Sequence, residues 1–180
     1  QMDAAIVLHA SCAIVVCSNT WQGGWYSMLQ QTYPQVSHPF AYELNKDFHF
    51  AAAHYVPSEK AGKCQRVHGH TYFANITIAG DQLDEAGFLV NFSIIKQLIH
   101  DKLDHTLLNE HGELFSDESS ALFPTTEVVA RVIYELIAAY LQTTDNKPLC
   151  LQVFLRETPT SYCIYRPVKL LRQLQAYQRL

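Results

Sequence analysis

Two stretches of alternating apolar and polar residues, separated by one loop, constrain the fold of this chain more than any other feature. The first stretch places Phe48, Phe50 and Ala52 on one parity and ends near His54. The second ends at Gly80, and its alternating apolar members are Tyr72, Ala74, Ile76 and Ile78. A period of two is typical of strands with one buried face. We therefore expect two strands that pair antiparallel across the loop of residues 55–67.

Two helices and two further strands are predicted after this pair. Ser93 is a suitable N-cap for a first helix, whose apolar stripe is Ile94, Ile95, Leu98 and Ile99. Thr125, after Pro124, is a suitable cap for a longer helix. Its apolar stripe repeats about every 3.6 residues and comprises Val128, Val129, Val132, Ile133, Leu136, Ile137, Tyr140 and Leu141.

The last two strands follow a polar connector. Alternation predicts that one strand places Leu149, Leu151, Val153 and Leu155 on a single face, and that Glu157 continues this parity. A turn at Pro159 leads into a final strand over residues 162–166. The order strand, strand, helix, helix, strand, strand predicts an α+β protein with an antiparallel sheet and two helices on one face.

Composition limits the function classes. The chain has 180 residues, with 13 basic and 17 acidic side chains and a formal net charge of −4. That balance disfavours a wide basic surface for nucleic acid or anionic lipid. The five cysteines are an odd number and do not resemble a disulfide framework, which favours a reducing compartment and a cytoplasmic location.

The two ends of the chain are expected to differ from the rest. Residues 1–27 contain a mostly apolar run that is too short to span a bilayer and that no Lys or Arg precedes. We expect them to be a leader or extension outside the fold. Residues 28–166 are then expected to form the folded domain, and residues 167–180 a C-terminal tail that can form an amphipathic helix.

Three of the nine histidines are expected to converge. His68 and His70 lie two apart on a strand, so their side chains share a face. If the strands pair across the loop, His54 falls opposite this doublet, whereas His49 has the other parity and points away. Three imidazoles with an open fourth position are typical of a catalytic zinc site, although two ordinary strand histidines would explain the doublet alone.

Three more residues are candidates for proton transfer. Cys64 lies four residues before His68, in a loop whose basic side chains favour the thiolate. Burial as a small apolar residue is the alternative, because free cysteines most often have this fate. Asp104 and His105 follow the first helix. If they reach Cys64, the three groups can shuttle protons at neutral pH.

Glu157 is unusual because its parity is that of an apolar strand face. A carboxylate at such a position is costly unless it is paired or lies at the strand end. One interpretation is a salt bridge to Arg156 or Arg166. The other is a substrate contact, in which the carboxylate accepts two parallel N–H groups from the guanidine-like edge of a planar heterocycle.

Six ordered motifs resemble the 6-pyruvoyltetrahydropterin synthase family. The resemblance covers about Leu29 to Arg166, and six segments in family order make it far more specific than the histidine doublet alone. The segments are Phe50–His54, Cys64–Tyr72, Gly87–Phe92, Leu103–Asn109, Pro124–Glu127 and Arg156–Thr158. Two departures occur: Asn91 stands where the family usually has Asp, and Val128 where Asn often follows the motif glutamate.

The resemblance implies both a fold and an assembly. The family has the tunnelling fold (T-fold), whose order of elements is the one read above. Its subunits close a barrel only by associating, usually as trimers that stack into hexamers. A homohexamer, built as a dimer of trimers with active sites at subunit interfaces, is therefore implied for this chain.

The resemblance also implies that residues 28–166 are a catalytic domain, and it implies the roles of the site residues. His54, His68 and His70 would hold zinc, Cys64 would be the base, and Asp104 and His105 would complete the proton relay. Glu157 would anchor the pterin ring. Thr126 and Glu127 match a family segment beside the pterin pocket, and this match is weaker than those of the other site residues.

The implied substrate is 7,8-dihydroneopterin triphosphate. Three residues separate Cys64 from His68, a spacing similar to that of the bacterial branch in the queuosine (7-deazaguanine) pathway of tRNA modification. That branch forms 6-carboxy-5,6,7,8-tetrahydropterin and releases acetaldehyde and triphosphate. The alternatives are the pyruvoyl-forming branch, which eliminates triphosphate without carbon–carbon cleavage, and a pterin-binding protein without catalytic activity.

Overall fold

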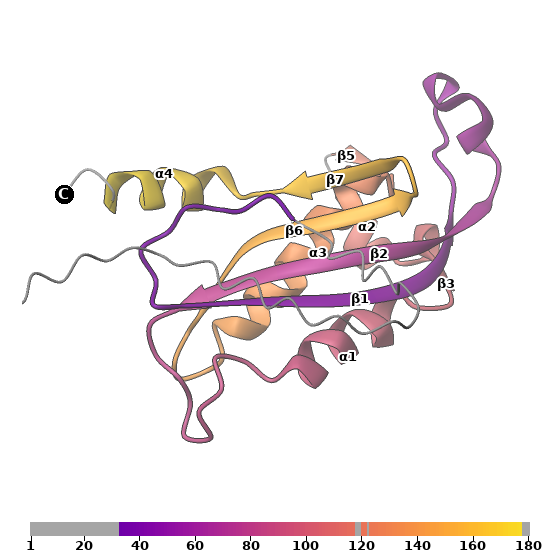
Figure 1. The fold of residues 1–180 in the computed structure, drawn as a ribbon. Coiled ribbons are helices and arrows are strands. Elements are labelled where there is room, and N and C mark those ends of the chain that lie inside the picture. The colour runs from indigo at the N-terminus through magenta and orange to yellow at the C-terminus, as the bar shows by residue number, and fades with distance from the viewer. Residues whose placement is uncertain (1–32, 118–119, 122, 178–180) are drawn as a thin grey trace, which may run out of the picture. The chain divides into compact units, whose positions relative to one another are not determined.

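The computed structural model describes residues 33–117, 120–121 and 123–177. The expected leader, residues 1–27, lies outside these ranges, as do the first residues of the predicted catalytic domain. Figure 1 shows a long strand pair that crosses the molecule, with helices behind it and one loop that projects beyond the end of the strands. This loop connects the two strands expected from the alternating sequence.

The main sheet has five strands in the order β3-β1-β2-β6-β7. All neighbouring pairs are antiparallel except the short β3, which runs parallel to β1. The expectation of a wholly antiparallel sheet is therefore wrong, because the chain leaving the first helix adds two residues along the outer edge of β1. The sheet is mixed and open. Its strands are β1 (Tyr42–His54), β2 (His68–Gly80), β3 (Thr106–Leu107), β6 (Leu149–Thr158) and β7 (Ser161–Tyr165).

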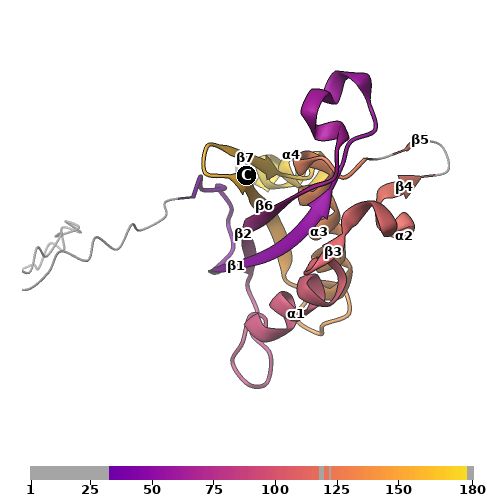
Figure 2. The same cartoon turned by 90° about the vertical axis from the view of Figure 1, so that its right-hand side faces the viewer.

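Two long helices cover one face of this sheet, as predicted. Figure 2 shows α1 (Phe92–Leu103) and α3 (Thr126–Leu141) on the same side of β1 and β2. None of the helices in the described ranges has the length and apolar composition needed to cross a bilayer. The smaller elements are η1 (Glu59–Gln65), η2 (Leu108–Glu110), α2 (Gly112–Phe115), β4 (Ser116–Asp117), β5 (Ser120–Ala121) and α4 (Val168–Tyr177).

The core forms between the helix stripes and the apolar parity of the strands. Ile99 of α1 and Ile133 of α3 are fully buried against the same cluster as Phe50 and Ile76. Each such side chain stabilises the fold by about 1.5–3 kcal/mol through removal from water. The predicted cap of α3 is also confirmed, since Thr125 Oγ1 accepts a hydrogen bond from the Val128 N–H at 3.4 Å.

The cap of α1 differs from the prediction. Asn91, and not Ser93, is the N-cap, because its Oδ1 accepts from the Ser93 N–H at 2.9 Å. Asn and Asp are about equally good at this position. The departure from the usual family aspartate therefore keeps the cap and removes only a charge.

The expected single apolar face of β6 is wrong. Thr77 pairs with Gln152 and Ile78 with Cys150, so Leu151 is an extra residue in a β-bulge. A bulge reverses the parity of the residues on either side of it. Val153 and Leu155 face the main core, whereas Leu149 and Leu151 face a second cluster that contains Val36, Ala79 and the α4 residues Leu170 and Leu174.

Candidate metal and active site

Three histidines meet where the β1–β2 pair ends. His54 pairs with His68, and His70 pairs with Ala52, so all three side chains project from the helix-covered face. Their ring centroids lie 4.5 Å (His54–His68), 5.3 Å (His54–His70) and 5.0 Å (His68–His70) apart. One nitrogen of each ring lies within 4.8 Å of the other two. The convergence expected from strand parity is present.

The ring orientations leave the Nε2 atoms available to a metal ion. Nδ1 of His54 lies 2.6 Å from the carbonyl oxygen of Pro124, and Nδ1 of His68 lies 2.8 Å from that of Arg66. A carbonyl only accepts, so each Nδ1 carries the proton and each Nε2 keeps its lone pair. Nε2 of His54 and of His70 is buried without a hydrogen-bond partner. Unpaired buried nitrogens of this kind fit a divalent metal ion.

The local electrostatics favour the neutral, ligating form of His70. Burial lowers its pKa, and the neighbouring His54 and His68 lower it further, while the Glu157 carboxylate partly opposes this shift. A deprotonated imidazole nitrogen is the form that binds metal. His49, by contrast, lies on the opposite face and stacks on Phe73 with ring centroids 5.9 Å apart, as its parity predicted.

Glu157 lies beside the histidine cluster. Its Oε1 is 3.5 Å from Nε2 of His54 and 3.9 Å from Nε2 of His70. The fully buried Tyr72 donates its hydroxyl to the same oxygen at 3.5 Å. Burial, followed by the nearby carboxylate, raises the pKa of Tyr72, which keeps this donor protonated. Arg166 donates to Gln152 at 2.9 Å, which disfavours the interpretation of Glu157 as its salt-bridge partner.

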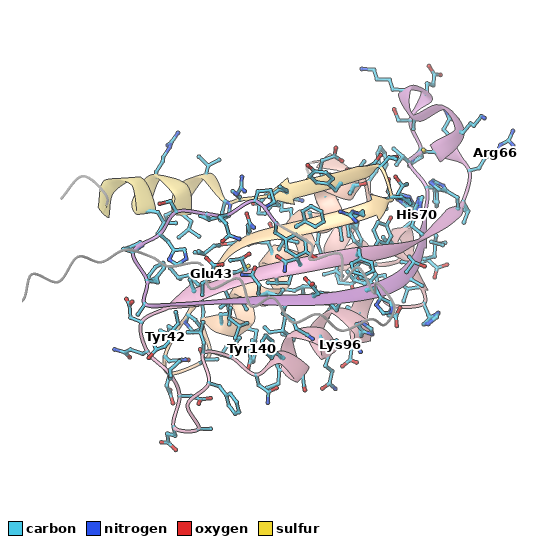
Figure 3. All side chains as sticks on the ribbon, viewed as in Figure 1. Tyr42, Glu43, Arg66, His70, Lys96 and Tyr140 are labelled. Carbon is cyan, nitrogen blue, oxygen red and sulfur yellow. The ribbon has the colours of Figure 1, made fainter. Side chains whose placement is uncertain are left out.

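A surface pocket joins several predicted site residues. The projecting loop carries Cys64 on η1, and Figure 3 shows Arg66 on this loop and His70 where the loop meets the sheet. Cys64 is exposed. It lines a pocket of about 330 Å³ together with His54, Glu157 and the first residues of α3, Thr126 and Glu127. The structure therefore brings the cysteine, the carboxylate and one metal-site histidine to a common space.

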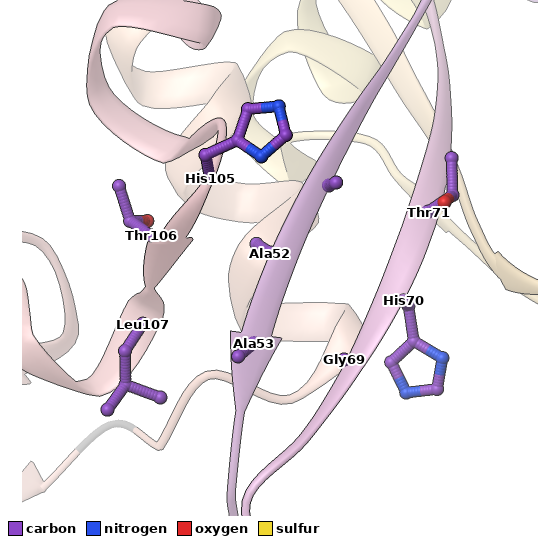
Figure 4. A pocket seen from close by; sticks show the side chains of 9 residues that line it. Ala52, Ala53, Gly69, His70, Thr71, His105, Thr106 and Leu107 are labelled. Atoms are coloured by element: carbon purple, nitrogen blue, oxygen red, sulfur yellow. The ribbon is translucent and has the colours of Figure 1, made fainter.

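His105, which directly follows Asp104, lines a different hollow, and His70 lines that hollow as well. Asp104 Oδ1 accepts from the Ala51 N–H at 2.8 Å, and the His105 N–H donates to the Ala51 carbonyl at 2.6 Å. The side chain of His105 is 83% exposed and lies beyond the outer edge of β1, whereas His70 lies beyond β2 (Figure 4). Ala51 and Gly69 also line this hollow. The chain by itself does not place this pair with Cys64.

The environment of Asp104 favours its charged form. Its Oδ2 lies 3.2 Å from Nδ1 of His100 and 3.8 Å from Nε2 of His105. Burial alone would raise the pKa of Asp104. The N–H donors of Ala51 and His105, together with the positive charge that His105 and His100 can carry, lower it overall. Asp104 is thus an anionic partner for the imidazole that follows it.

Sequence reasoning did not identify three contacts that support the cluster. They are the Pro124 carbonyl on His54, the Tyr72 hydroxyl on Glu157, and the two hydrogen bonds between the Asn109 side chain and the backbone of Tyr55. Tyr72 shares the parity of His70, which is a signal in the sequence. Asn109 ends a family motif, but nothing in that motif indicates its partner.

Comparison with known proteins identifies the family. The sequence profile described as 6-pyruvoyl tetrahydropterin synthase matches residues 43–168. The chain is 62% identical over 142 residues to the 6-carboxy-5,6,7,8-tetrahydropterin synthase of Bacillus subtilis (strain 168), covering 79% of this chain and 97% of that protein. The protein of the same name from Synechocystis sp. is 36% identical over 99 residues, which cover 51% of this chain and 70% of the relative.

A solved structure shows the same fold. The 6-pyruvoyl tetrahydropterin synthase of Caenorhabditis elegans superposes with a TM-score of 0.56 at 24% identity, covering 74% of this chain and 99% of that chain. The order of elements, the matched profile and the bacterial relatives agree with the resemblance seen in the sequence motifs. The chain therefore belongs to the 6-pyruvoyl tetrahydropterin synthase family of enzymes.

Proposed function

We propose that this enzyme is a zinc-dependent carbon–carbon lyase that converts 7,8-dihydroneopterin triphosphate to 6-carboxy-5,6,7,8-tetrahydropterin. The observation that carries the proposal is the cluster of three histidines, in which Nε2 of His54 and of His70 is buried and unpaired, beside Glu157 and the Cys64 pocket. The 62% identity to a bacterial protein named for this product supports the carboxy-forming branch.

The three histidines would hold zinc, with one position left open for substrate. When bound there, zinc would act as a Lewis acid that acidifies the substrate hydroxyls and the adjacent carbon-bound proton. Cys64 removes that proton as a thiolate. Glu157 anchors the pterin ring by accepting its paired N–H groups, and Thr126 and Glu127 border the same pocket.

The reaction requires an elimination and a cleavage. Triphosphate leaves from the substrate side chain. The bond between the first and second side-chain carbons, counted from the pterin ring, then breaks to release acetaldehyde. Summed over all atoms, the two steps consume one water. Protons return to the ring and to the two-carbon fragment, and His105, paired with Asp104, is the group that delivers them.

We infer that the His105 and Asp104 that serve each Cys64 come from a second copy of the chain. Within one chain, His105 lines a hollow to which Cys64 does not contribute. Along its outer edge β1 is paired only at Ala52 and Ala53 in the described part of the chain, and an unpaired strand edge is a template for another chain. We therefore place catalysis in a homohexamer, a dimer of trimers, in which neighbouring sheets close a barrel and neighbouring loops complete each site.

The same proposal assigns the enzyme to queuosine (7-deazaguanine) biosynthesis, a tRNA modification pathway of the cytoplasm. The alternative is the pyruvoyl-forming reaction, which ends after triphosphate elimination. A pterin-binding role without catalysis is the third possibility. It is disfavoured because the chain retains Cys64, Asp104 and His105.

Product analysis separates these functions. After incubation of the zinc-loaded protein with 7,8-dihydroneopterin triphosphate, we expect acetaldehyde and triphosphate in about equal amounts, as the atom balance requires. Acetaldehyde can be trapped as a hydrazone, and the pterin product identified by mass spectrometry. Triphosphate without acetaldehyde would refute carbon–carbon cleavage and assign the pyruvoyl branch. Intact substrate after prolonged incubation would refute both enzymatic functions.

A further inference from the structure

Residues 104–109 form a segment, here called the brace, that runs along the last residues of β1. Hydrogen bonds attach both the first and the last residues of the brace to this part of the chain. At its start, Asp104 and His105 bond both backbone groups of Ala51. In its middle, β3 pairs with Ala52 and Ala53. At its end, Asn109 contacts Tyr55. The brace therefore spans the stretch of backbone that includes the metal-site residue His54.

Asn109 makes the contact that continues this pairing past the end of β1. Its Oδ1 accepts from the Tyr55 N–H, and its Nδ2 donates to the Tyr55 carbonyl, each at 2.9 Å. One side-chain amide thus satisfies both backbone groups of the residue that follows His54. An aliphatic side chain at this position would leave a partly buried donor and acceptor without these partners.

The fixed residue lies between two parts of the candidate site. His54 precedes Tyr55 directly, and its ring is oriented by the Pro124 carbonyl. Val56 follows, and its N–H donates to the carbonyl of Cys64 at 2.8 Å. This hydrogen bond joins the beginning of the projecting loop to the segment that carries Cys64. The backbone that Asn109 holds therefore carries the metal-site histidine on one side and the hydrogen bond to Cys64 on the other.

We infer that Asn109 is a positioning residue that couples the metal site to the Cys64 loop. It touches neither metal nor substrate. Its side chain holds the backbone at Tyr55, between His54 and the Val56 N–H that bonds to Cys64. Loss of the Asn109 amide therefore weakens both the positioning of His54 and the attachment of the Cys64 loop. This inference rests on the proposed zinc site. Substitution of a residue that orients a metal ligand from outside the coordination sphere typically lowers metal affinity by about 10–100-fold.

Three variants test the inference: Asn109→Ala, Asn109→Asp and the control Asn146→Ala. Asn146 is also a partly buried amide, and it donates to the carbonyls of Gln82 at 3.1 Å and Leu89 at 2.9 Å. It lies in the connector between α3 and β6 and outside both hollows described above. The control therefore removes comparable hydrogen bonds without reaching His54 or Cys64.

Zinc affinity, measured on the full-length protein by competition with a chromophoric chelator, is the first readout. We expect Asn109→Ala to raise the zinc dissociation constant about 10–100-fold and Asn146→Ala to leave it unchanged. Both variants should lower the melting temperature by a similar amount. Asn109→Asp keeps the acceptor for the Tyr55 N–H but loses the donor, so its affinity should be intermediate. It also replaces Asn109→Ala as the test if the alanine variant does not fold.

Amide hydrogen exchange at Val56 is the second readout. We expect Asn109→Ala to increase this rate about tenfold, the effect of losing roughly 1.4 kcal/mol of local stability. Unchanged zinc affinity and unchanged Val56 exchange in a folded Asn109 variant would overturn the inference and leave Asn109 a purely structural residue. If the wild-type protein binds no zinc, the proposed metal site fails instead, and Val56 exchange alone decides the role of the brace.

Discussion

Replacing His68 by alanine is expected to remove most of the bound zinc and to abolish turnover. Structural zinc sites bind with about 10–16 kcal/mol, so the loss of one imidazole from a small ligand set costs roughly 3 kcal/mol or more. Because 1.4 kcal/mol is about a tenfold change, the zinc dissociation constant should rise by at least about 100-fold. Zinc per chain after gel filtration, measured by atomic emission, checks this value.

His49→Ala is the matched control for this variant. His49 lies on β1 like His54, but it projects from the other face and stacks on Phe73. We expect the His49→Ala protein to retain both its zinc and its turnover. A His68→Ala protein that keeps full zinc occupancy would show that the metal is held elsewhere.

Replacing Cys64 by alanine is expected to reduce turnover by about 10²–10⁴-fold, the usual contribution of a general base. Zinc content should stay at the wild-type level, because Cys64 reaches the site from η1 and is not part of the histidine cluster. Steady-state release of triphosphate measures the first chemical step. The combination of lost turnover and retained zinc distinguishes a base from a ligand.

Gln65→Ala is the control for this second variant, since Gln65 follows Cys64 on the same exposed 3-10 helix. It should turn over substrate at the wild-type rate, which rules out a general disturbance of the loop. Full activity in Cys64→Ala would show that another group removes the proton.

The sequence was informative where structure depends on local periodicity. The alternation that ends at His54 and the doublet His68 and His70 specify which faces these side chains share once the two strands pair. The 3.6-residue stripe and the Thr125 cap of α3 are local in the same sense. These signals were sufficient to predict both the helix-covered face and the three-histidine cluster.

Features that depend on one extra residue were not predictable from periodicity. Leu151 is inserted into β6 as a bulge, and the alternation continues through it in the sequence although the faces exchange in space. The cap of α1 is similar, because Asn91 and Ser93 are both good caps and lie two residues apart. The parallel pairing of β3 involves only two residues, too few to leave a pattern.

Contacts between distant segments were the other limit. Nothing near Asn109 indicates that its amide pairs with Tyr55, 54 residues earlier. Asp104 and His105 were predicted as partners of Cys64, yet within one chain they bond to Ala51 of β1, and His105 lines a hollow separate from the Cys64 pocket. A sequence contains no direct sign of whether such partners meet within one subunit or between two.

The most direct test of a catalytic metal site is turnover as a function of zinc occupancy. Protein stripped by exhaustive chelation should release neither triphosphate nor acetaldehyde. Added zinc should restore both in proportion to occupancy, with saturation at about one zinc per chain, as expected for three histidines with an open fourth position. Full turnover by the stripped protein, at negligible zinc content, would contradict the account.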